Sequence, residues 1–264
     1  MLKMAVIGKD VSKSLSPKMH QFIMGKLGQT VEYDAVSIAP ERFGSEIVSV
    51  LETYDCINVT IPFKRDVMPF LSEIKGDAKT FGAVNTVNTS REGYNTDGMG
   101  FVLSLQANGI DVKGKKVLVV GTGGVGRAVI KKLAEEGADV YASERDQTRL
   151  KEVYDEFSCF TPLTAVENER YYLVLNCTGV GMHKTEGISP VGEDLLSLCD
   201  VAYDLIYEPK KSEFLRIAER LGKQIVNGEG MLFYQAYYAD CIFLKKQSDL
   251  EEAKRLFALY TEEV

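Results

Sequence analysis

The chain has 264 residues, and 45% of them are hydrophobic, which is an ordinary fraction for a soluble globular protein. This length suits one large domain or two modest domains. The formal net charge of -7 argues against general nucleic-acid binding. The apolar runs are no longer than a strand and the first residues lack a signal-peptide pattern, so we expect no membrane partner.

The numbers and positions of cysteine and histidine limit which disulfides, metal sites and catalytic groups the chain can form. The five cysteines are scattered, odd in number and form no Cys-x-x-Cys pair, so we expect reduced thiols and a cytoplasmic protein. Only two histidines are present, His20 and His183, which leaves little material for a histidine-based metal site or a Ser-His-Asp triad. We therefore expect no metal.

Strand-like and helical patterns alternate from the N-terminus onward. In the first part of the chain they predict the strands Lys3–Gly8, Val31–Ile38 and Cys56–Ile61, a hairpin of Ala83–Thr89 with Glu92–Asn95, and the helices Ser16–Leu27, Pro40–Thr53 and Asp97–Asn108. Ser16 before Pro17 is the combination expected where a helix starts, and Asp97 is a second candidate N-cap.

A glycine-rich turn lies between a strand and a helix in the middle of the chain. The turn Gly121–Gly126 reads Gly-Thr-Gly-Gly-Val-Gly, follows the apolar run Val117–Val120, and precedes an amphipathic segment that opens at Arg127. Glycines let backbone N–H groups approach a pyrophosphate, and a helix N-terminus adds a partial positive charge. Because Gly137 is well placed to end the helix, the sequence predicts a dinucleotide-binding turn rather than an ordinary one.

The second half continues the alternation and ends in helices. Its predicted strands are Lys116–Val120, Asp139–Ser143, Cys159–Pro162, Leu173–Thr178, Val201–Ile206 and Gln224–Asn227. This pattern is typical of an open parallel sheet covered on both faces. No sheet remains for the last two predicted helices, Met231–Lys246 and Leu250–Tyr260, so we expect them to return to the first domain.

These patterns predict an α/β fold in two domains. Residues 1–100, completed by 235–264, would form an α/β domain that binds substrate and carries the catalytic groups. Residues 101–234 would form a Rossmann-type domain with a doubly wound parallel sheet that binds NAD(P).

Short polar residues gather after the strands of the first domain. The segment Ser12–Ser14 offers two hydroxyls and the Lys13 ammonium beside a helix N-terminus, where they would hold a carboxylate; a plain capping loop is the alternative. The segment Asn58–Lys64, Asn85 and Asp97 add an ammonium, an amide and a carboxylate. A lone lysine is nearly always a solvated surface charge. Taken together, these groups are what is needed to hold a polyhydroxylated ring.

Five motifs occur in order along the chain: Gly8 with Ser14-Leu15-Ser16-Pro17 and His20, Asn58–Lys64, Gly82–Thr86, Asn95–Gly98, and Gly228–Leu232 with Gln235. With the central dinucleotide turn, they resemble shikimate dehydrogenase, and the resemblance covers nearly the whole chain. It implies reversible reduction of 3-dehydroshikimate to shikimate by NADP(H), a step of aromatic amino acid (chorismate) biosynthesis. It also implies a monomer or a homodimer.

The resemblance implies a role for each matching residue. Lys64 would be the catalytic residue, with Asp97 as its acid–base partner. The substrate carboxylate would be bound by Ser14, Ser16 and Tyr207, and the ring hydroxyls by Thr60, Asn85, Asp97 and Gln235. The cofactor residues expected are Gly121, Gly123, Gly124, Val125, Gly126, Glu144, Arg145, Arg149, Thr178, Met182 and Gly228.

The chemistry favours the same catalytic pair. Reducing a ketone requires a proton at oxygen as hydride reaches carbon, and a lysine held by a carboxylate is the natural acid in a chain with so few histidines. The cofactor carries the hydride, and the protein supplies placement and the proton. We expect a cleft between the domains to bring the nicotinamide to the ring.

The chain departs from the family pattern in two places. In the first loop Asp10 and Lys13 stand where the family often has Pro and His, which bears on shikimate versus quinate as substrate. After the second Rossmann strand, Glu144-Arg145-Asp146 replaces the Asn-Arg-Thr of NADP-dependent members. An acidic residue there bonds the ribose hydroxyls of NAD and repels a 2′-phosphate. We keep NADP first, with NAD as the alternative because of Glu144 and Asp146.

Other functions remain as alternatives. A quinate/shikimate dehydrogenase that uses NAD shares the ring contacts. A methylenetetrahydrofolate dehydrogenase/cyclohydrolase shares the two-domain plan and a lysine, but the serine and Asn-Thr-Asp-Gly motifs speak against it. A non-catalytic sensor of shikimate or dinucleotide would not require both Lys64 and Asp97. The segment Asn176–Met182 is a second glycine-rich strand end, for which a tight turn is the plain reading, and we do not expect Cys177 to be a nucleophile.

Overall fold

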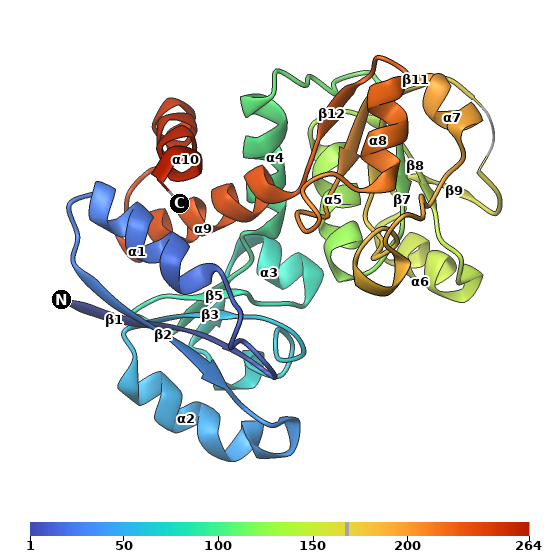
Figure 1. Ribbon diagram of the computed structural model, residues 1–264. Coiled ribbons are helices and arrows are strands. Elements are labelled where there is room, and N and C mark those ends of the chain that lie inside the picture. Colours follow the sequence, from blue (N-terminus) through green and yellow to red (C-terminus); the bar gives the residue numbers. More distant parts are fainter. Residues whose placement is uncertain (167–168, 264) are drawn as a thin grey trace. The chain divides into compact units, whose positions relative to one another are not determined.

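The computed structural model describes residues 1–166 and 169–263 of the chain. The chain divides into two compact units: Met1–Gly100 with Phe233–Val264, and Phe101–Leu232. Each unit contains its own six-stranded sheet (Figure 1). Within the described residues, no helix combines the length and apolar character needed to cross a membrane.

The sheet of the first unit has the strand order β2-β1-β3-β5-β6-β4. β1 pairs in parallel with both β2 and β3, whereas β5 pairs antiparallel with β3 and β6. The strands are β1 (Leu2–Gly8), β2 (Val31–Ser37), β3 (Cys56–Val59), β4 (Glu73–Ile74), β5 (Thr86–Val87) and β6 (Glu92–Tyr94). The hairpin predicted from the sequence is therefore present, with shorter strands, and the two-residue β4 was not predicted because so short a run has no periodicity.

The helices of this unit cover both faces of the sheet. They are α1 (Ser16–Lys26), α2 (Phe43–Thr53), α3 (Gly76–Phe81), the residues of α9 (Glu229–Phe243) from Phe233 on, and α10 (Leu250–Glu263), with 3₁₀ turns η1 (Pro40–Arg42) and η2 (Met68–Phe70). Successive residues of β1 point to opposite faces. Ala5 and Ile7 pack in the core with Phe43 of α2, and Met4 and Val6 pack with Ala239 and Phe243 of α9.

Both N-caps predicted from the sequence are wrong. Helix α1 begins at Ser16, and it is the Ser14 hydroxyl that accepts the backbone N–H of Ser16, at 3.2 Å. Helix α4 (Asp97–Ala107) begins at Asp97, whose backbone N–H is accepted by the side-chain oxygen of Asn95 at 3.0 Å. In both helices the first backbone N–H is bonded to a polar side chain two residues earlier, in the turn before the helix.

The sheet of the second unit is parallel throughout, with the order β12-β11-β10-β7-β8-β9. Its strands are β7 (Lys116–Val120), β8 (Asp139–Ser143), β9 (Thr161–Leu163), β10 (Tyr171–Asn176), β11 (Cys199–Asp204) and β12 (Gln224–Val226). The strand order reverses between β7 and β10, which defines the switch point where such sheets bind ligands. The prediction of a two-domain α/β fold with a doubly wound parallel sheet is confirmed.

Helices α5 (Gly124–Glu135), α6 (Gln147–Phe157), α7 (Glu193–Ser197) and α8 (Glu213–Arg220) and the 3₁₀ turn η3 (His183–Thr185) connect these strands. Several boundaries differ from the prediction; β10 begins at Tyr171 rather than at Leu173, and β11 begins at Cys199 rather than at Val201. Helix α5 begins at Gly124 rather than at Arg127, because the glycines themselves enter the helix. Strand β9 begins at Thr161 rather than at Cys159, and it lies at the sheet edge, where Pro162 costs no internal hydrogen bond.

Candidate active site

The polar segments of the first unit meet at one edge of its sheet. β1 and β3 are parallel, with Ile7 beside Val59, so the segments that follow them leave the sheet at the same edge. The backbone N–H of Thr60 donates to Ile7 O at 2.9 Å, and that of Lys9 donates to Ile61 O at 3.2 Å. The two segments are thus joined directly after the strands end.

Gly8 is required for this close approach. A Cβ at position 8 would lie 2.6 Å from Cγ2 of Thr60 and 2.7 Å from Cγ1 of Val11. Contacts this short do not occur between carbon atoms, so any other residue would push the two segments apart. The first glycine of the family motif is therefore explained by packing beneath Thr60.

Lys64 and Asp97 form a direct ion pair in this cluster. Lys64 Nζ donates to Asp97 Oδ2 at 2.6 Å, although the residues are 33 positions apart in the sequence. The side chains are 24% and 16% exposed, so the pair is mostly shielded but reachable from solvent. The backbone carbonyl of Lys64 accepts the N–H of Val84 at 2.7 Å, which fixes the lysine to the segment that leads into β5.

Asn85 is bonded to Asp97, and Gln235 is bonded to the adjacent Thr96. Asn85 Nδ2 donates to Asp97 Oδ1 at 2.9 Å, so both carboxylate oxygens are engaged. The Thr96 hydroxyl lies 3.2 Å from Gln235 Oε1. Helix α9, which carries Gln235, packs closely against α4 at Gly100. A Cβ on Gly100 would lie 2.6 Å from Gln235 Cβ, so this close packing requires glycine. The structure thus brings together Lys64, Asn85, Asp97 and Gln235.

In the loop after β1, the hydroxyls of Ser12 and Ser14 have different hydrogen-bond roles. The Ser12 hydroxyl donates to Asp10 Oδ1 at 2.7 Å, and this bond, with that of the Ser12 N–H, lowers the pKa of the Asp10 carboxyl. The hydroxyl proton of Ser12 is therefore already used in a hydrogen bond to Asp10. The Ser14 hydroxyl accepts a backbone N–H and keeps its own proton to donate. Lys13 is exposed.

The glycine turn of the second unit is shaped by its own backbone. Gly121 has a φ of 97°, which favours glycine, and a Cβ on Gly126 would lie only 2.3 Å from the Gly121 carbonyl oxygen. A Cβ on Gly123 or Gly124 would meet nothing within 4 Å, so the turn is open at these two positions. Gly123 is the N-cap of α5 and supplies no side chain to its first N–H groups, which fits a pyrophosphate.

Glu144, at the end of β8, is bonded to this turn. Its Oε2 accepts the backbone N–H of Thr122 at 3.0 Å, and its Oε1 accepts that of Asp146 at 3.3 Å. Burial alone would raise the pKa of Glu144, but these N–H donors and the Arg149 guanidinium outweigh it and lower the pKa. Arg149 Nη1 lies 3.9 Å from Glu144 Oε2, whereas Arg145 is exposed. Glu144 is therefore a fixed anion beside the turn.

Asp146 has a structural role. Its Oδ1 accepts the backbone N–H groups of Thr148 and Arg149, at 3.1 and 3.3 Å, which makes it the N-cap of α6. The Asp146 carboxylate is therefore turned to its own helix, whereas the Glu144 carboxylate is bonded to the glycine turn.

The other predicted cofactor residues follow β10 and β12: Thr178 and Met182 come after β10, and Gly228 comes after β12. Asn176 Oδ1 accepts both the N–H and the hydroxyl of Thr178, at 2.9 and 2.7 Å. A Cβ on Gly121 would touch Thr178 Cγ2 at 2.6 Å, so Thr178 borders the glycine turn. A Cβ on Gly228 would lie 2.0 Å from Leu205 O, and a Cβ on Gly179 would lie 3.9 Å from the sulfur of Met182.

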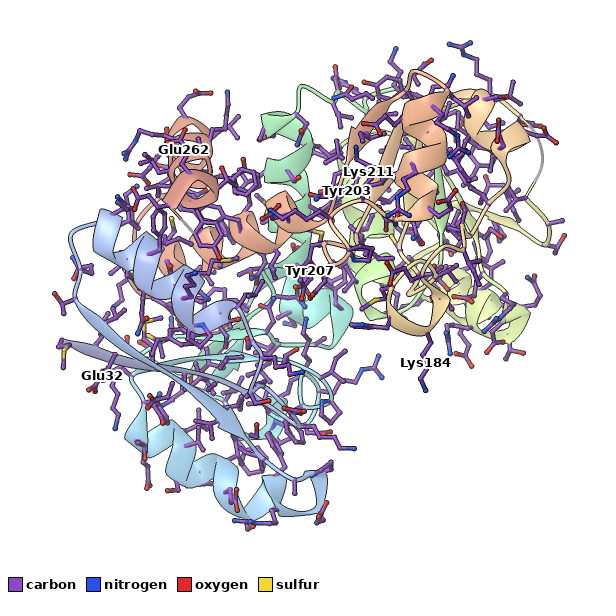
Figure 2. All side chains as sticks on the ribbon, viewed as in Figure 1. Glu32, Lys184, Tyr203, Tyr207, Lys211 and Glu262 are labelled. Carbon is purple, nitrogen blue, oxygen red and sulfur yellow. The ribbon has the colours of Figure 1, made fainter. Side chains whose placement is uncertain are left out.

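Tyr207 follows β11 and is labelled in Figure 2. It is 40% exposed, and partial burial, with the Glu208 carboxylate nearby, raises the pKa of its hydroxyl. The hydroxyl therefore stays protonated near neutral pH and is available as a donor.

Sequence reasoning missed a buried polar pair beneath these strand ends. Asp204, fully buried at the end of β11, accepts hydrogen bonds from Asn176 Nδ2 at 3.0 Å and from the Ser212 hydroxyl at 2.5 Å. Burial raises its pKa to about 6, although these bonds oppose the shift. The available signal was a polar residue closing an apolar strand, which also describes many ordinary strand ends. Among residues 1–166 and 169–263, no group of three or more His, Cys, Asp or Glu side chains is placed to hold a metal ion.

Comparison with known proteins agrees with this architecture. The family model "Shikimate dehydrogenase substrate binding domain" matches residues 6–87, and the model "D-isomer specific 2-hydroxyacid dehydrogenase, NAD binding domain" matches residues 81–188. A curated relative named shikimate dehydrogenase (NADP(+)), from Carboxydothermus hydrogenoformans, is 36% identical; the match covers 89% of this chain and 88% of the relative.

Two solved structures extend the comparison. Shikimate 5-dehydrogenase from Thermus thermophilus, in complex with NADP(H) and shikimate, has a TM-score of 0.87, 33% identity, and a match over 98% of this chain and 99% of that one. The enzyme from Listeria monocytogenes, in complex with shikimate and NAD, has a TM-score of 0.85, 26% identity, and a match over 97% of this chain and 96% of that one.

The fold and the glycine turn, with these relatives, define an NAD(P)-dependent oxidoreductase. More particularly, the chain belongs to the shikimate dehydrogenase family, as the resemblance of its motifs predicted.

Proposed function

We propose that this protein catalyses the reversible NADP(H)-linked reduction of 3-dehydroshikimate to shikimate. The observation that carries the proposal is the pair of Lys64 and Asp97, 2.6 Å apart and partly open to solvent, in a chain of this family. A simple binding protein would not require an ammonium held in this way.

Lys64 is the acid in the direction of ketone reduction. It donates a proton to the carbonyl oxygen as that oxygen gains negative charge, and in the reverse direction it accepts the proton of the hydroxyl. Asp97 holds the ammonium in place through Oδ2 and keeps Oδ1 on the Asn85 amide. The carboxylate therefore orients the lysine.

The remaining polar groups of the first unit bind the ring. Asn85 has one Nδ2 hydrogen left for a ring hydroxyl, and Thr60 and Gln235 are assigned to further hydroxyls by the family pattern. Ser14 is assigned to the substrate carboxylate because its hydroxyl retains a donor proton. Ser16 and Tyr207 are assigned to the same carboxylate.

The dinucleotide is assigned to the glycine turn of the second unit. When bound, it supplies the hydride. Gly121, Gly123, Gly124, Val125 and Gly126 form the turn, and its fit rests on the packing that excludes a Cβ at Gly126 and the openness at Gly123 and Gly124. Thr178, Met182 and Gly228 are assigned to the nicotinamide half. NADP is proposed because curated relatives carry it in their names.

A second candidate is a quinate/shikimate dehydrogenase that uses NAD. It is favoured by one observation, the fixed anion at Glu144, which would lie against the additional phosphate of NADP if the adenosine ribose binds there. Arg145 and Arg149 oppose this effect because both would attract the phosphate.

The test is an ultraviolet assay of the purified protein with shikimate or quinate, each with NADP or NAD. The proposal predicts the highest kcat/KM with shikimate and NADP. Activity confined to quinate with NAD would select the second candidate. Binding of shikimate by calorimetry without any reduced cofactor would replace both with a sensor. We place the protein in the cytoplasm because its five cysteines are all free thiols.

A further inference from the structure

A chain of polar side chains runs through the first unit and ends on Asp97. The Tyr33 hydroxyl donates to Asn58 Oδ1 at 2.7 Å, and Asn58 Nδ2 lies 3.3 Å from Thr86 Oγ1. The Thr86 hydroxyl donates to Asn85 Oδ1 at 2.9 Å, and Asn85 Nδ2 donates to Asp97 Oδ1 at 2.9 Å. The chain starts on β2, crosses β3 and β5, and reaches the start of α4.

Two backbone groups fix the direction of the hydrogen bonds in this chain. The N–H of Thr96 points at the side chain of Asn85 at 2.9 Å, and an N–H can only donate. The facing atom of Asn85 is therefore the oxygen, so its NH₂ group faces Asp97. If this amide turned over, two donors would meet at Thr96 and two acceptors would meet at Asp97.

The same reasoning orients the rest of the chain. Asn58 Nδ2 also donates to the backbone carbonyl of Asn85 at 3.3 Å, which fixes the Asn58 amide with its oxygen toward Tyr33. Since that amide nitrogen also faces Thr86 Oγ1, the Thr86 proton is turned to Asn85 Oδ1. In each side chain of the series, the group that donates and the group that accepts are therefore fixed.

All four side chains before Asp97 are buried. Tyr33 is 5% exposed, Asn58 7%, Thr86 0% and Asn85 4%. Buried polar groups are costly when left without a partner, so no member can turn away without a loss to its neighbours. Only the last member, Asp97, is in contact with the catalytic lysine.

Tyr33 is itself held in place at the far end. Its ring stacks on His20 with a centroid distance of 4.8 Å and an interplanar angle of 10°, and His20 Nδ1 lies 2.6 Å from Asp240 Oδ1. Burial raises the pKa of the Tyr33 hydroxyl well above its usual value, with the nearby Asp240 and Cys56 adding to the shift. The hydroxyl therefore remains a proton donor over the working pH range.

We infer that Tyr33, Asn58 and Thr86 are positioning residues that fix the Asn85 amide and, through it, the Asp97 carboxylate against Lys64. The inference rests on the proposed function, because it assigns the acid–base pair as the group being positioned. It gives a role to the asparagine of Asn58–Lys64 and the threonine of Gly82–Thr86, neither of which is assigned to a substrate contact.

The test compares Thr86→Val with Thr86→Ser in shikimate oxidation at saturating substrate and cofactor. Valine has the shape of threonine but removes the donor to Asn85, whereas serine keeps it. A misplacement on the order of 1 Å can cost about 100-fold in rate, so we expect Thr86→Val to lower kcat by about tenfold. Thr86→Ser should retain most of kcat. Equal kcat values in the two variants would overturn the inference.

A second variant acts farther from Asp97. Tyr33→Phe removes one hydroxyl and should lower kcat less than Thr86→Val. The double variant should be no slower than Thr86→Val alone, because both act through the same Asn85 amide. Tyr54→Phe is the matched control, since the Tyr54 hydroxyl bonds to Asp34 and not to a member of this chain, and its kcat should be unchanged. If the loss in kcat of the double variant equalled the product of the two single losses, the two residues would act independently, which would contradict the inference.

A measurement without turnover separates this inference from the proposed function. In nitrogen-labelled protein, the side-chain amide hydrogens of Asn85 should exchange slowly in the wild type and in Thr86→Ser, and faster in Thr86→Val. A wild type inactive toward shikimate would refute the proposed function alone. Identical exchange in all three proteins would refute the positioning chain, whatever the activity.

Discussion

The carboxylate of Glu144 accepts the backbone N–H of Thr122 at 3.0 Å, so the end of β8 is bonded directly to the glycine turn. The Thr122 hydroxyl lies 3.3 Å from the same oxygen, and Thr122 is fully buried. Turning Glu144 away would leave the Thr122 N–H without this acceptor. The anion is therefore held at the place where parallel α/β sheets bind the adenosine ribose of a dinucleotide.

Replacing this carboxylate should change the choice of cofactor. Glu144→Gln keeps an oxygen for Thr122 but removes the charge. Like charges about 4 Å apart repel by about 4 kcal/mol at an effective dielectric of 20, before screening by solvent and salt. Because screening reduces this figure, we expect the ratio of kcat/KM for NADP to that for NAD to rise by about tenfold, or 1.4 kcal/mol.

The control for this variant is Glu152→Gln, an exposed residue on α6 that should leave the ratio unchanged. Dissociation constants for the two cofactors, measured without substrate, should show the same trend. A Glu144→Gln protein with the wild-type ratio would mean that the carboxylate does not approach the ribose.

Asp204 should make folding stability depend on pH. Its folded pKa of about 6 lies above its ordinary value of 3.8, so the folded chain keeps a proton that the unfolded chain has lost between these values. Stability from this group is therefore fully present below about pH 4 and is lost as pH rises through about 6. A shift of about two units corresponds to roughly 3 kcal/mol.

This dependence should be missing from Asp204→Asn, whose amide still satisfies Asn176 and Ser212. Denaturant unfolding at acid and neutral pH should show that the variant gains stability relative to the wild type as pH rises. Asp200→Asn, an exposed change on the same strand, serves as the control and should follow the wild type. A constant difference between Asp204→Asn and wild type across this range would disprove the assignment.

The glycine turn should tolerate alanine at one position and reject it at another. Alanine at 126 would place Cβ 2.3 Å from the Gly121 carbonyl oxygen, whereas alanine at 124 would meet nothing within 4 Å. Overpacking costs about 1–3 kcal/mol. We expect Gly126→Ala to lower the thermal midpoint of the cofactor-free protein by about 5 °C.

Gly124→Ala should keep the wild-type midpoint or exceed it, because alanine favours helix by about 1 kcal/mol relative to glycine. Both changes lie in α5, so the comparison isolates the contact with Gly121. Equal thermal midpoints in the two variants would show that the turn relaxes around the added carbon.

Much of the fold could be predicted from periodicity and turn residues. The apolar run before Gly121 predicted β7, and the alternation after it predicted the parallel sheet. The caps were predicted wrongly because Ser16 and Asp97 have side chains typical of N-caps, whereas both residues are already the first residues of their helices. Local preference did not reveal at which residue each helix begins.

The sequence indicated candidate residues for the site, but not the hydrogen bonds that connect them. Asn85 was expected to bind a ring hydroxyl, and its bond to Asp97 appears only when β5 and α4 are placed together. The sequence shows Asn58 and Thr86 only as parts of motifs, since the role of a buried amide or hydroxyl depends on partners far apart in the sequence. Non-local hydrogen bonds of this kind have no signature in a single chain.

The proposed reaction depends on Lys64 as the acid–base group, held by Asp97. Loss of a general acid–base group costs about 10²–10⁴-fold in rate. The most direct measurement is kcat for shikimate oxidation by Lys64→Ala, with shikimate binding followed by calorimetry and the exposed Lys79→Ala as control. We expect a kcat lower by about 100-fold or more, with shikimate still bound. A Lys64→Ala enzyme that turns over at the wild-type rate would contradict this role.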